Sequence, residues 1–181
     1  NLSLAFPELS IKDRNKLALE HFEAMGVSLA ELGLSRWGSK EMLLENSAWE
    51  GKQYVQEALN TGRGIILLSA HFTSLEICGR ILRYDFPEFD VVYRRNRNPF
   101  ITEILRSTRE IYARTAIEKR DIKSMIRNLK NGGAVWYAPD QSYNRKQSEV
   151  LSFFNIPAMT NTATSTIAKI GNAVVLPFFP R

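Results

Sequence analysis

Two kinds of hydrophobic pattern divide the chain near residue 61. Before that point apolar residues recur at the spacing of a helix, and Ser10 and Asp13 precede them in the arrangement of a capping box. The apolar positions of this first helix are Leu17, Leu19, Phe22, Met25 and Leu29. A second helix is predicted over 49–59, with a turn at 60–62 to end it. The first 60 residues are therefore expected to be helical.

From residue 64 onward, short apolar runs alternate with stretches of helical spacing. The run from Ile65 to Leu68 is continuous and follows Gly64, which is typical of a buried strand. The other predicted strands are 89–93, 134–138 and 173–179, and the predicted helices are 73–83, 99–112 (capped by Asn98), 120–131 and 162–170. Strands separated by helices predict an α/β fold, with a mostly parallel sheet flanked by helices. We expect one domain over 1–181, with a helical N-terminal segment at 1–60 and an α/β core at 61–181.

Several classes of protein are disfavoured by the same pattern. The longest apolar runs have the length of a strand, whereas a membrane-spanning helix needs about 20 residues. The first residues lack the profile of a signal peptide, and Cys78 is the single cysteine, so no internal disulfide is expected. The last predicted strand ends at Phe179 with no helix after it to cover the sheet, so we expect the natural protein to be longer.

The charge is unevenly distributed. The net charge is +5, but between Arg94 and Lys130 eleven Lys or Arg residues accompany only four acids, and the rest of the chain is slightly acidic. Such a segment predicts an anionic partner, which could be a nucleic acid, a phosphorylated headgroup, an acidic membrane or an acidic protein. Two solvated helix faces would give the same pattern.

The candidate chemistry centres on His71. Neither nucleotide-binding glycine loop is present, a standard zinc site lacks ligands, and no G-x-S-x-G elbow occurs. His71 lies just after the first strand, where α/β sheets bind ligands, and Glu76 lies near the start of the next helix. A carboxylate folded back onto one ring nitrogen would raise the basicity of the other and allow it to deprotonate a hydroxyl. A buried, hydrogen-bonded histidine explains the spacing equally well.

The stretch from His71 to Glu76 resembles the H-x4-D/E block of the glycerolipid acyltransferase superfamily. Further blocks are similar to those of the lipid A biosynthesis acyltransferases of the lauroyl and myristoyl type, in the same order along essentially the whole chain. These blocks are Phe6–Ser10, Val92–Arg94 with Asn98–Pro99, Arg120–Lys123, Ala134–Gln141 and Leu176–Arg181.

The resemblance implies an enzyme of the bacterial inner membrane that faces the cytoplasm. It would transfer a fatty acyl chain from acyl carrier protein, which is strongly acidic, to a hydroxyl of a phosphorylated lipid A precursor (secondary acylation of Kdo-lipid IVA). No metal and no cofactor are implied. An anionic membrane surface is a further expected partner, and nucleic acid is not. The resemblance also implies a membrane anchor before this chain begins and further chain after it ends.

The resemblance implies a role for each matching site residue. His71 matches the general base and Glu76 its orienting carboxylate, while Arg109 would supply positive charge to the substrate. Asp140 matches the acid that follows the strand at 134–138, and we expect it to position Arg109 or another cation. Without the family, a structural ion pair would account for Arg109 and Asp140. The residues expected to bind substrate are Arg94, Asn98, Arg120, Lys123 and Gln141.

Other interpretations remain open. The aromatic residues Trp136, Tyr137, Phe153 and Phe154 either line an acyl channel or belong to the core. The enzyme could act on a lysophospholipid or another glycolipid acceptor. A protein of another class, a non-catalytic basic module, could bind an anionic membrane or nucleic acid through 94–130. Few aromatic residues interleave with the basic ones there, which gives little support to nucleic-acid stacking.

Overall fold

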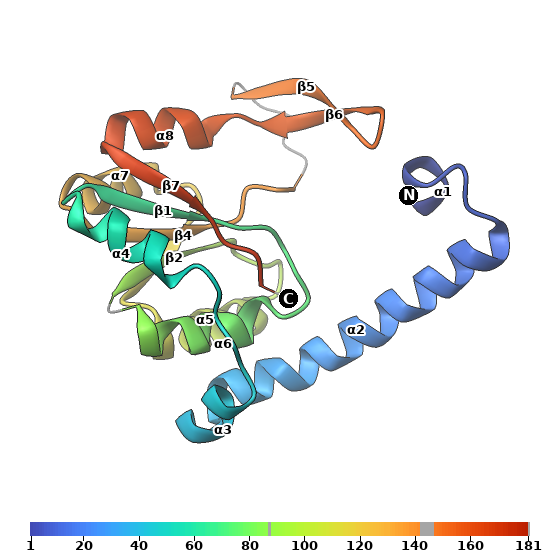
Figure 1. Cartoon of the computed structure of the whole chain (residues 1–181), viewed down its shortest axis with the longest axis horizontal. Coiled ribbons are helices and arrows are strands. Elements are labelled where there is room, and N and C mark those ends of the chain that lie inside the picture. Colours follow the sequence, from blue (N-terminus) through green and yellow to red (C-terminus); the bar gives the residue numbers. More distant parts are fainter. Residues whose placement is uncertain (87, 142–146, 181) are drawn as a thin grey trace.

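The centre of the molecule is a five-stranded parallel sheet with the strand order β3-β2-β4-β1-β7 (Figure 1). The computed structural model describes residues 1–86, 88–141 and 147–180. The strands of the sheet are β1 Gly64–Leu68, β2 Phe89–Tyr93, β3 Thr115–Glu118, β4 Ala134–Tyr137 and β7 Ala173–Pro177. The predicted α/β fold with a parallel sheet is confirmed.

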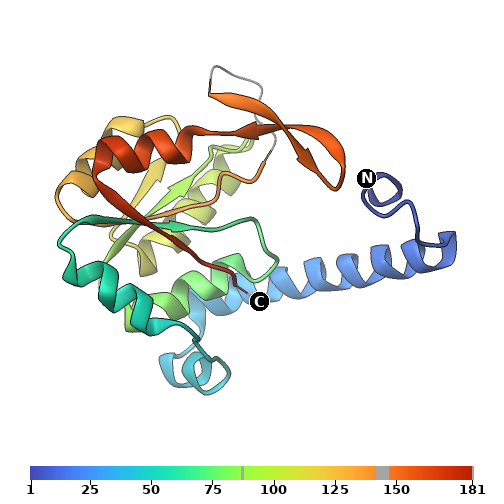
Figure 2. The ribbon, with the colours of Figure 1, turned by 45° about the horizontal axis from the view of Figure 1, so that its top comes forward.

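Helices cover both faces of this sheet (Figure 2). On one face lie α4 Lys52–Asn60, α5 Leu75–Asp85 and α6 Pro99–Tyr112, and on the other α7 Ile122–Lys130 and α8 Ala163–Gly171. Successive side chains of β1 alternate between the faces, because Ile65 and Leu67 join the core on the first face and Ile66 joins the core on the second. All three are almost fully buried, which explains the continuous apolar run.

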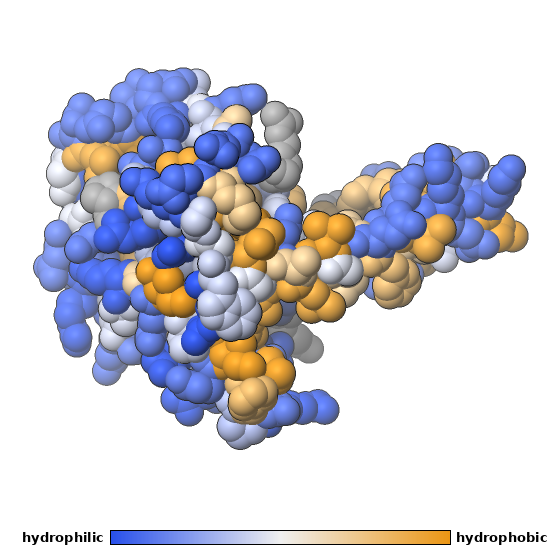
Figure 3. All heavy atoms as spheres, turned by 90° about the horizontal axis from the view of Figure 1, so that it is seen from below, coloured by the Kyte–Doolittle hydropathy of each residue, from blue (hydrophilic) through white to orange (hydrophobic). Residues whose placement is uncertain are grey.

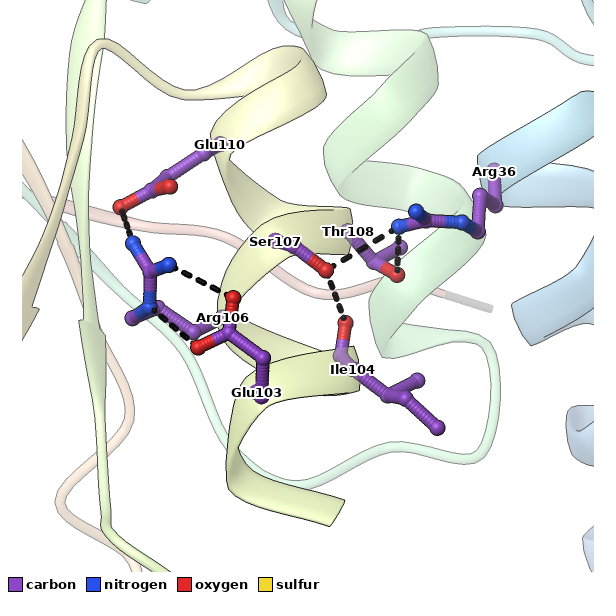
Figure 4. Close-up of polar contacts among 7 residues, drawn as sticks. All are labelled: Arg36, Glu103, Ile104, Arg106, Ser107, Thr108 and Glu110. Atoms are coloured by element: carbon purple, nitrogen blue, oxygen red, sulfur yellow. Dashed lines mark hydrogen bonds and ion pairs between the residues drawn. The ribbon is translucent and has the colours of Figure 1, made fainter. Parts of the chain in front are cut away.

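The N-terminal segment contains three helices, α1 Leu2–Ala5, α2 Ile11–Trp37 and α3 Lys40–Glu45. The predicted cap is present, since the Ser10 hydroxyl accepts a hydrogen bond from the Asp13 amide at 3.2 Å. Near the C-terminal end of α2, Arg36 donates hydrogen bonds to the hydroxyls of Ser107 and Thr108 on α6 (Figure 4). The rest of α2 projects beyond the sheet, and hydrophobic residues lie exposed along it (Figure 3). No helix within the described ranges is long and apolar enough to cross a membrane.

Two strand regions differ from the prediction. β3 is absent from the predicted elements because it has four residues at a sheet edge and only Ile117 among them is buried. The antiparallel hairpin of β5 Ser148–Phe153 and β6 Ile156–Asn161 was also not predicted. No side chain of the hairpin is buried: β5 is exposed after its first residue, and β6 is exposed at its first two residues and half-buried beyond them. The turn places Phe154 and Asn155 at positive φ without a glycine. The usual sequence signals of a half-buried strand and of a tight hairpin turn are therefore missing.

Two helical glycines are expected to respond oppositely to substitution by alanine. A Cβ on Gly79 of α5 would lie 2.6 Å from the Trp136 ring and 2.7 Å from the Tyr112 ring. Gly79→Ala should therefore lower the free energy of unfolding by about 1–3 kcal/mol through overpacking. A Cβ on Gly26 of α2 would meet no atom within 4 Å, so Gly26→Ala should raise it by about 0.5–1 kcal/mol. Urea unfolding of the two variants measures both changes. A higher free energy of unfolding in Gly79→Ala would contradict the packing of α5, and a lower one in Gly26→Ala would contradict the open space around α2.

Candidate active site

His71 and Asp140 meet at the carboxyl edge of the sheet. β1 and β4 are neighbours, and Leu68 pairs with Tyr137, so the two chains leave the sheet at the same level. His71 and Asp140 each lie three residues further along. The His71 backbone amide donates a hydrogen bond to Asp140 Oδ2 at 3.0 Å, and the His71 Nδ1 atom lies 2.5 Å from Asp140 Oδ1.

This contact fixes what the His71 ring can do. A carboxylate accepts a hydrogen bond from Nδ1–H, so the proton of the neutral ring stays on Nδ1 and the free lone pair is on Nε2. Nε2 has no hydrogen-bond partner among the residues that the structure describes. The side chain of His71 is 46% exposed and that of Asp140 35% exposed, so a substrate can reach the ring. The arrangement is that of an oriented general base.

Glu76 has different partners from those predicted. It receives hydrogen bonds from Arg109 Nε at 3.1 Å and from the Tyr112 hydroxyl at 2.9 Å, both on α6. The Glu76 and Arg109 side chains are only 16% and 12% exposed. The predicted pairing of His71 with Glu76 is therefore wrong, because Glu76 binds Arg109 instead. Asp140, which was expected to position Arg109 or another cation, contacts His71 and not Arg109. Glu76 is the second residue of α5 and faces α6, whereas Asp140 follows the strand next to that of His71.

The pKa shifts in this buried cluster follow from its charges. Burial disfavours the charge on Arg109, but the charge of Glu76 and its hydrogen bonds outweigh this cost and raise the pKa of Arg109. Burial, followed by the neighbouring Glu76 carboxylate, raises the pKa of Tyr112 well above its usual value. Arg109 therefore stays charged beside Glu76, and Tyr112 stays protonated as a hydrogen-bond donor to Glu76. Arg109 also donates to the Val92 carbonyl at 3.2 Å, which ties the cluster to β2.

A cleft of about 1070 Å³ opens beside His71. Among the described residues, its lining includes six Lys or Arg side chains and no Asp or Glu; these cations are Arg94, Arg95, Arg97, Arg109, Lys119 and Arg120. Most of them come from the loops after β2 and β3, whose carboxyl ends lie at the same edge as His71. The cleft is thus suited to an anionic ligand.

Of the five predicted substrate-binding residues, three line the cleft and two do not. Arg94, Arg120 and Gln141 line the cleft. Asn98 and Lys123 are not among its lining residues: Asn98 caps α6 by accepting a hydrogen bond from the Phe100 amide, as its predicted cap position requires, and Lys123 is exposed in the first turn of α7.

The aromatic residues also fall into two groups. Trp136 and Tyr137 are buried core residues, which confirms that interpretation, and they also border the cleft. That they line an acyl channel stays a prediction. Phe153 and Phe154 are exposed at the end of the hairpin and belong to neither core cluster.

The hairpin contributes cleft residues that sequence reasoning missed. Gln147, just before β5, and Asn161, the last residue of β6, line the cleft from the base of the hairpin. Asn161 Nδ2 donates a hydrogen bond to the Tyr137 hydroxyl at 3.2 Å. Because the hairpin itself was not predicted, no signal marked these residues. No group of three His, Cys, Asp or Glu side chains able to hold a metal occurs in the part of the chain that is described.

Fold and site together define an α/β protein with an oriented imidazole beside a basic cleft, a site suited to base-assisted chemistry on an anionic substrate. The whole chain, residues 1–181, matches the family model described as bacterial lipid A biosynthesis acyltransferase, so the chain belongs to this family. The predicted resemblance is confirmed.

Individual relatives agree with this membership. The chain is 33% identical to the lipid A biosynthesis lauroyltransferase of Escherichia coli K12, over 100% of this chain and 59% of that protein. It is 31% identical to a lipid A biosynthesis acyltransferase of Haemophilus influenzae, over 99% of this chain and 58% of the relative. It is 24% identical to the lipid A biosynthesis myristoyltransferase of E. coli K12, over 99% of this chain and 56% of that protein. The chain thus spans less than two thirds of the length of these relatives.

The free energy of unfolding tests whether Glu76 is the partner of Arg109 and Asp140 the partner of His71. Glu76→Gln leaves the buried Arg109 without a counter-charge, so we expect the free energy of unfolding to fall by about 3 kcal/mol. Asp140→Asn removes one member of a half-exposed pair and should cost less than about 1 kcal/mol. Urea unfolding distinguishes the two variants. Equal losses of stability in the two variants would contradict the assignment of Glu76 to a buried ion pair and of Asp140 to a half-exposed one.

Proposed function

We propose that this chain carries the catalytic site of an acyltransferase that moves a fatty acyl chain from acyl carrier protein to a hydroxyl of a lipid A precursor, in the secondary acylation of Kdo-lipid IVA. His71 acts as the general base and Asp140 orients it. The observation that carries this proposal is the contact between His71 and Asp140 at the mouth of a basic cleft. Membership in the lipid A biosynthesis acyltransferase family supplies the reaction class.

The reaction needs only proton transfer and orientation from the protein. His71 Nε2 takes the proton of the acceptor hydroxyl while the hydroxyl oxygen attacks the thioester carbonyl. The new C–O bond forms, the C–S bond breaks, and the proton on the imidazolium passes to the leaving thiolate. Asp140 stabilises the imidazolium that exists between these steps. A thioester is already activated, so no acyl-enzyme is required.

Arg109 and Glu76 act as positioning residues in this proposal. Arg109 borders the cleft, but its charge is compensated by Glu76 in a mostly buried pair. The pair holds the start of α5 against α6, and His71 lies in the loop just before α5. Disturbing the pair would therefore displace the loop that carries the base.

The basic cleft is the proposed binding site for the anionic groups of the acceptor. Arg94 and Arg120 approach it from the loops after β2 and β3, and Gln141 from the loop after β4. Phosphates bind strongly to such clustered cations, and Arg can contact them with two donors at once. The relatives named as lauroyl, palmitoleoyl and myristoyl transferases support a lipid A precursor as the acceptor class.

The proposed place of action is the cytoplasmic face of the bacterial inner membrane, at an anionic membrane surface. A lipid acceptor must be taken from a bilayer, and exposed apolar side chains occur on α2 and on the hairpin. Those of the hairpin are Val150, Leu151, Phe153, Phe154 and Ile156. They are of the kind that contacts lipid at an interface.

Mass spectrometry tests the reaction directly. A tetra-acylated, Kdo-bearing lipid A precursor is incubated with a panel of acyl carrier protein thioesters and the enzyme. We expect the acceptor to gain the mass of one acyl chain, and His71→Ala to lower kcat by about 10²–10⁴-fold because the general base is removed. Asp140→Asn should also lower kcat, while the fold is retained. Transfer to a lysophospholipid in place of this acceptor would refute the proposed acceptor, and full activity in His71→Ala would refute the proposed base.

The role of the cleft cations is tested separately. Arg94→Gln with Arg120→Gln should raise the KM for the acceptor by about tenfold or more, because two charged hydrogen-bond donors are lost. The kcat should change much less, since neither residue belongs to the His71–Asp140 pair. Lys169→Gln, which removes an exposed cation from α8, is the control. An equal rise in KM for the control would show that overall charge, and not the cleft, binds the acceptor.

A further inference from the structure

The structure divides the basic segment 94–130 into three groups with different surroundings. The first is neutralised by acids: Arg106 by Glu103 and Glu110 (Figure 4), Arg109 by Glu76, and Arg114 by Asp90. The second group lines the cleft beside His71 and consists of Arg94, Arg95, Arg97, Lys119 and Arg120; Arg109 of the first group borders the same cleft. The third lies on the outer face of α7 and has no place in the proposed reaction.

The third group forms a regular stripe. Lys123, Arg127 and Lys130 follow one another at intervals of four and three residues, so they lie on the same side of α7. All three are exposed, whereas Met125 and Leu129 turn the opposite side of the helix into the core. Within the described residues no ion pair joins any of the three to a carboxylate.

The stripe leads to the cleft. Ile122, the first residue of α7, lines the cleft, and so does Arg120 just before it. From Lys123 to Lys130 the helix rises about 10 Å. A partner on this face would therefore lie next to the cleft mouth.

One acid, Asp121, lies at the start of α7 and offsets part of the charge of the stripe. Asp121 accepts hydrogen bonds from the Ser124 amide and hydroxyl as the cap of α7; these hydrogen bonds lower its pKa, and the charges of Arg127 and Lys123 lower it further. Its carboxylate is thus engaged at the helix start, and the remaining length of α7 carries no acidic residue.

The surroundings favour an acidic protein over a membrane as the partner. None of the described side chains of α7 is a large exposed hydrophobic group, so nothing on this face would enter a bilayer. Exposed apolar side chains are numerous instead on α2 and the hairpin, and α7 and α2 lie on opposite sides of the sheet (Figure 1). A row of unpaired cations on a rigid helix is complementary to the acidic face of a folded protein.

We propose that the outer face of α7, formed by Lys123, Arg127 and Lys130, is the docking surface for the acidic acyl carrier protein, and that it delivers the thioester to the cleft through the side marked by Arg120. This inference rests on the proposed function, because that function supplies the carrier as the acyl donor. The docking surface is separate from the acceptor site. Donor and acceptor are thus recognised by different cations of the same segment.

The test compares two donors that share one thioester. The variant Arg127→Glu/Lys130→Glu reverses two charges of the stripe without touching the cleft cations. We expect its KM for the acyl carrier protein thioester, and the Kd for the carrier itself, to rise about tenfold at low salt, with a smaller rise at high salt. With acyl-pantetheine, which lacks the acidic protein, its rate should equal that of the parent.

Matched variants control for charge and folding. Lys12→Glu/Lys16→Glu makes the same change in charge on exposed positions of α2 and should bind the carrier as the parent does. Arg127→Gln/Lys130→Gln avoids placing acids in the last turn of α7 and should give a smaller rise of the same kind. Circular dichroism and thermal unfolding establish that each variant is folded.

Each other outcome overturns one identified statement. Equal carrier binding by the parent and the α7 variant refutes docking on α7, and so does an equal loss in the α2 control. Loss of binding to phosphatidylglycerol vesicles with unchanged carrier binding assigns the face to a membrane instead. Absence of transfer by the parent from either donor refutes the proposed function, and the carrier Kd then still decides the docking surface.

Discussion

The parallel pairing of β1 with β4 is the constraint on which the site depends. With Leu68 opposite Tyr137, the two strands end at the same level, and three further residues bring His71 against Asp140. Because side chains alternate along a strand, a shift of the pairing by one residue would turn every buried side chain of β1 to the wrong face. The same apolar packing that fixes the core therefore also fixes the distance between the imidazole and its carboxylate.

The buried cluster of Glu76, Arg109 and Tyr112 complements this constraint from the helical side. β1 determines where the loop with His71 begins. The cluster fixes the position of α5, and α5 is where that loop ends. Gly79 allows the rings of Tyr112 and Trp136 to approach α5, so the cluster and the apolar core share one interface. A buried ion pair is stabilising only when its geometry is well satisfied, and here the hydroxyl of Tyr112 donates a further hydrogen bond to Glu76.

The sequence predicted the strongly patterned elements and missed the weak ones. α6 and β2 have the predicted bounds because Asn98 caps the helix and the strand is apolar and largely buried, whereas β3 and the hairpin carry little buried surface. The residues that meet at this site were named from the sequence, but Glu76 was wrongly assigned as the partner of His71. Spacing along the chain favours Glu76 for His71, and only the strand order, which no local pattern contains, brings Asp140 there.

The basic segment shows why net charge alone is a poor guide to function. Three of its arginines, Arg106, Arg109 and Arg114, form close ion pairs within the chain with the glutamates of α6, Glu76 and Asp90. The cations that remain are separated by the fold, since the loops after β2 and β3 direct one group into the cleft and the periodicity of α7 directs another outward. An enzyme with two anionic substrates needs such a separation, because a single cationic surface would let each substrate compete for the site of the other.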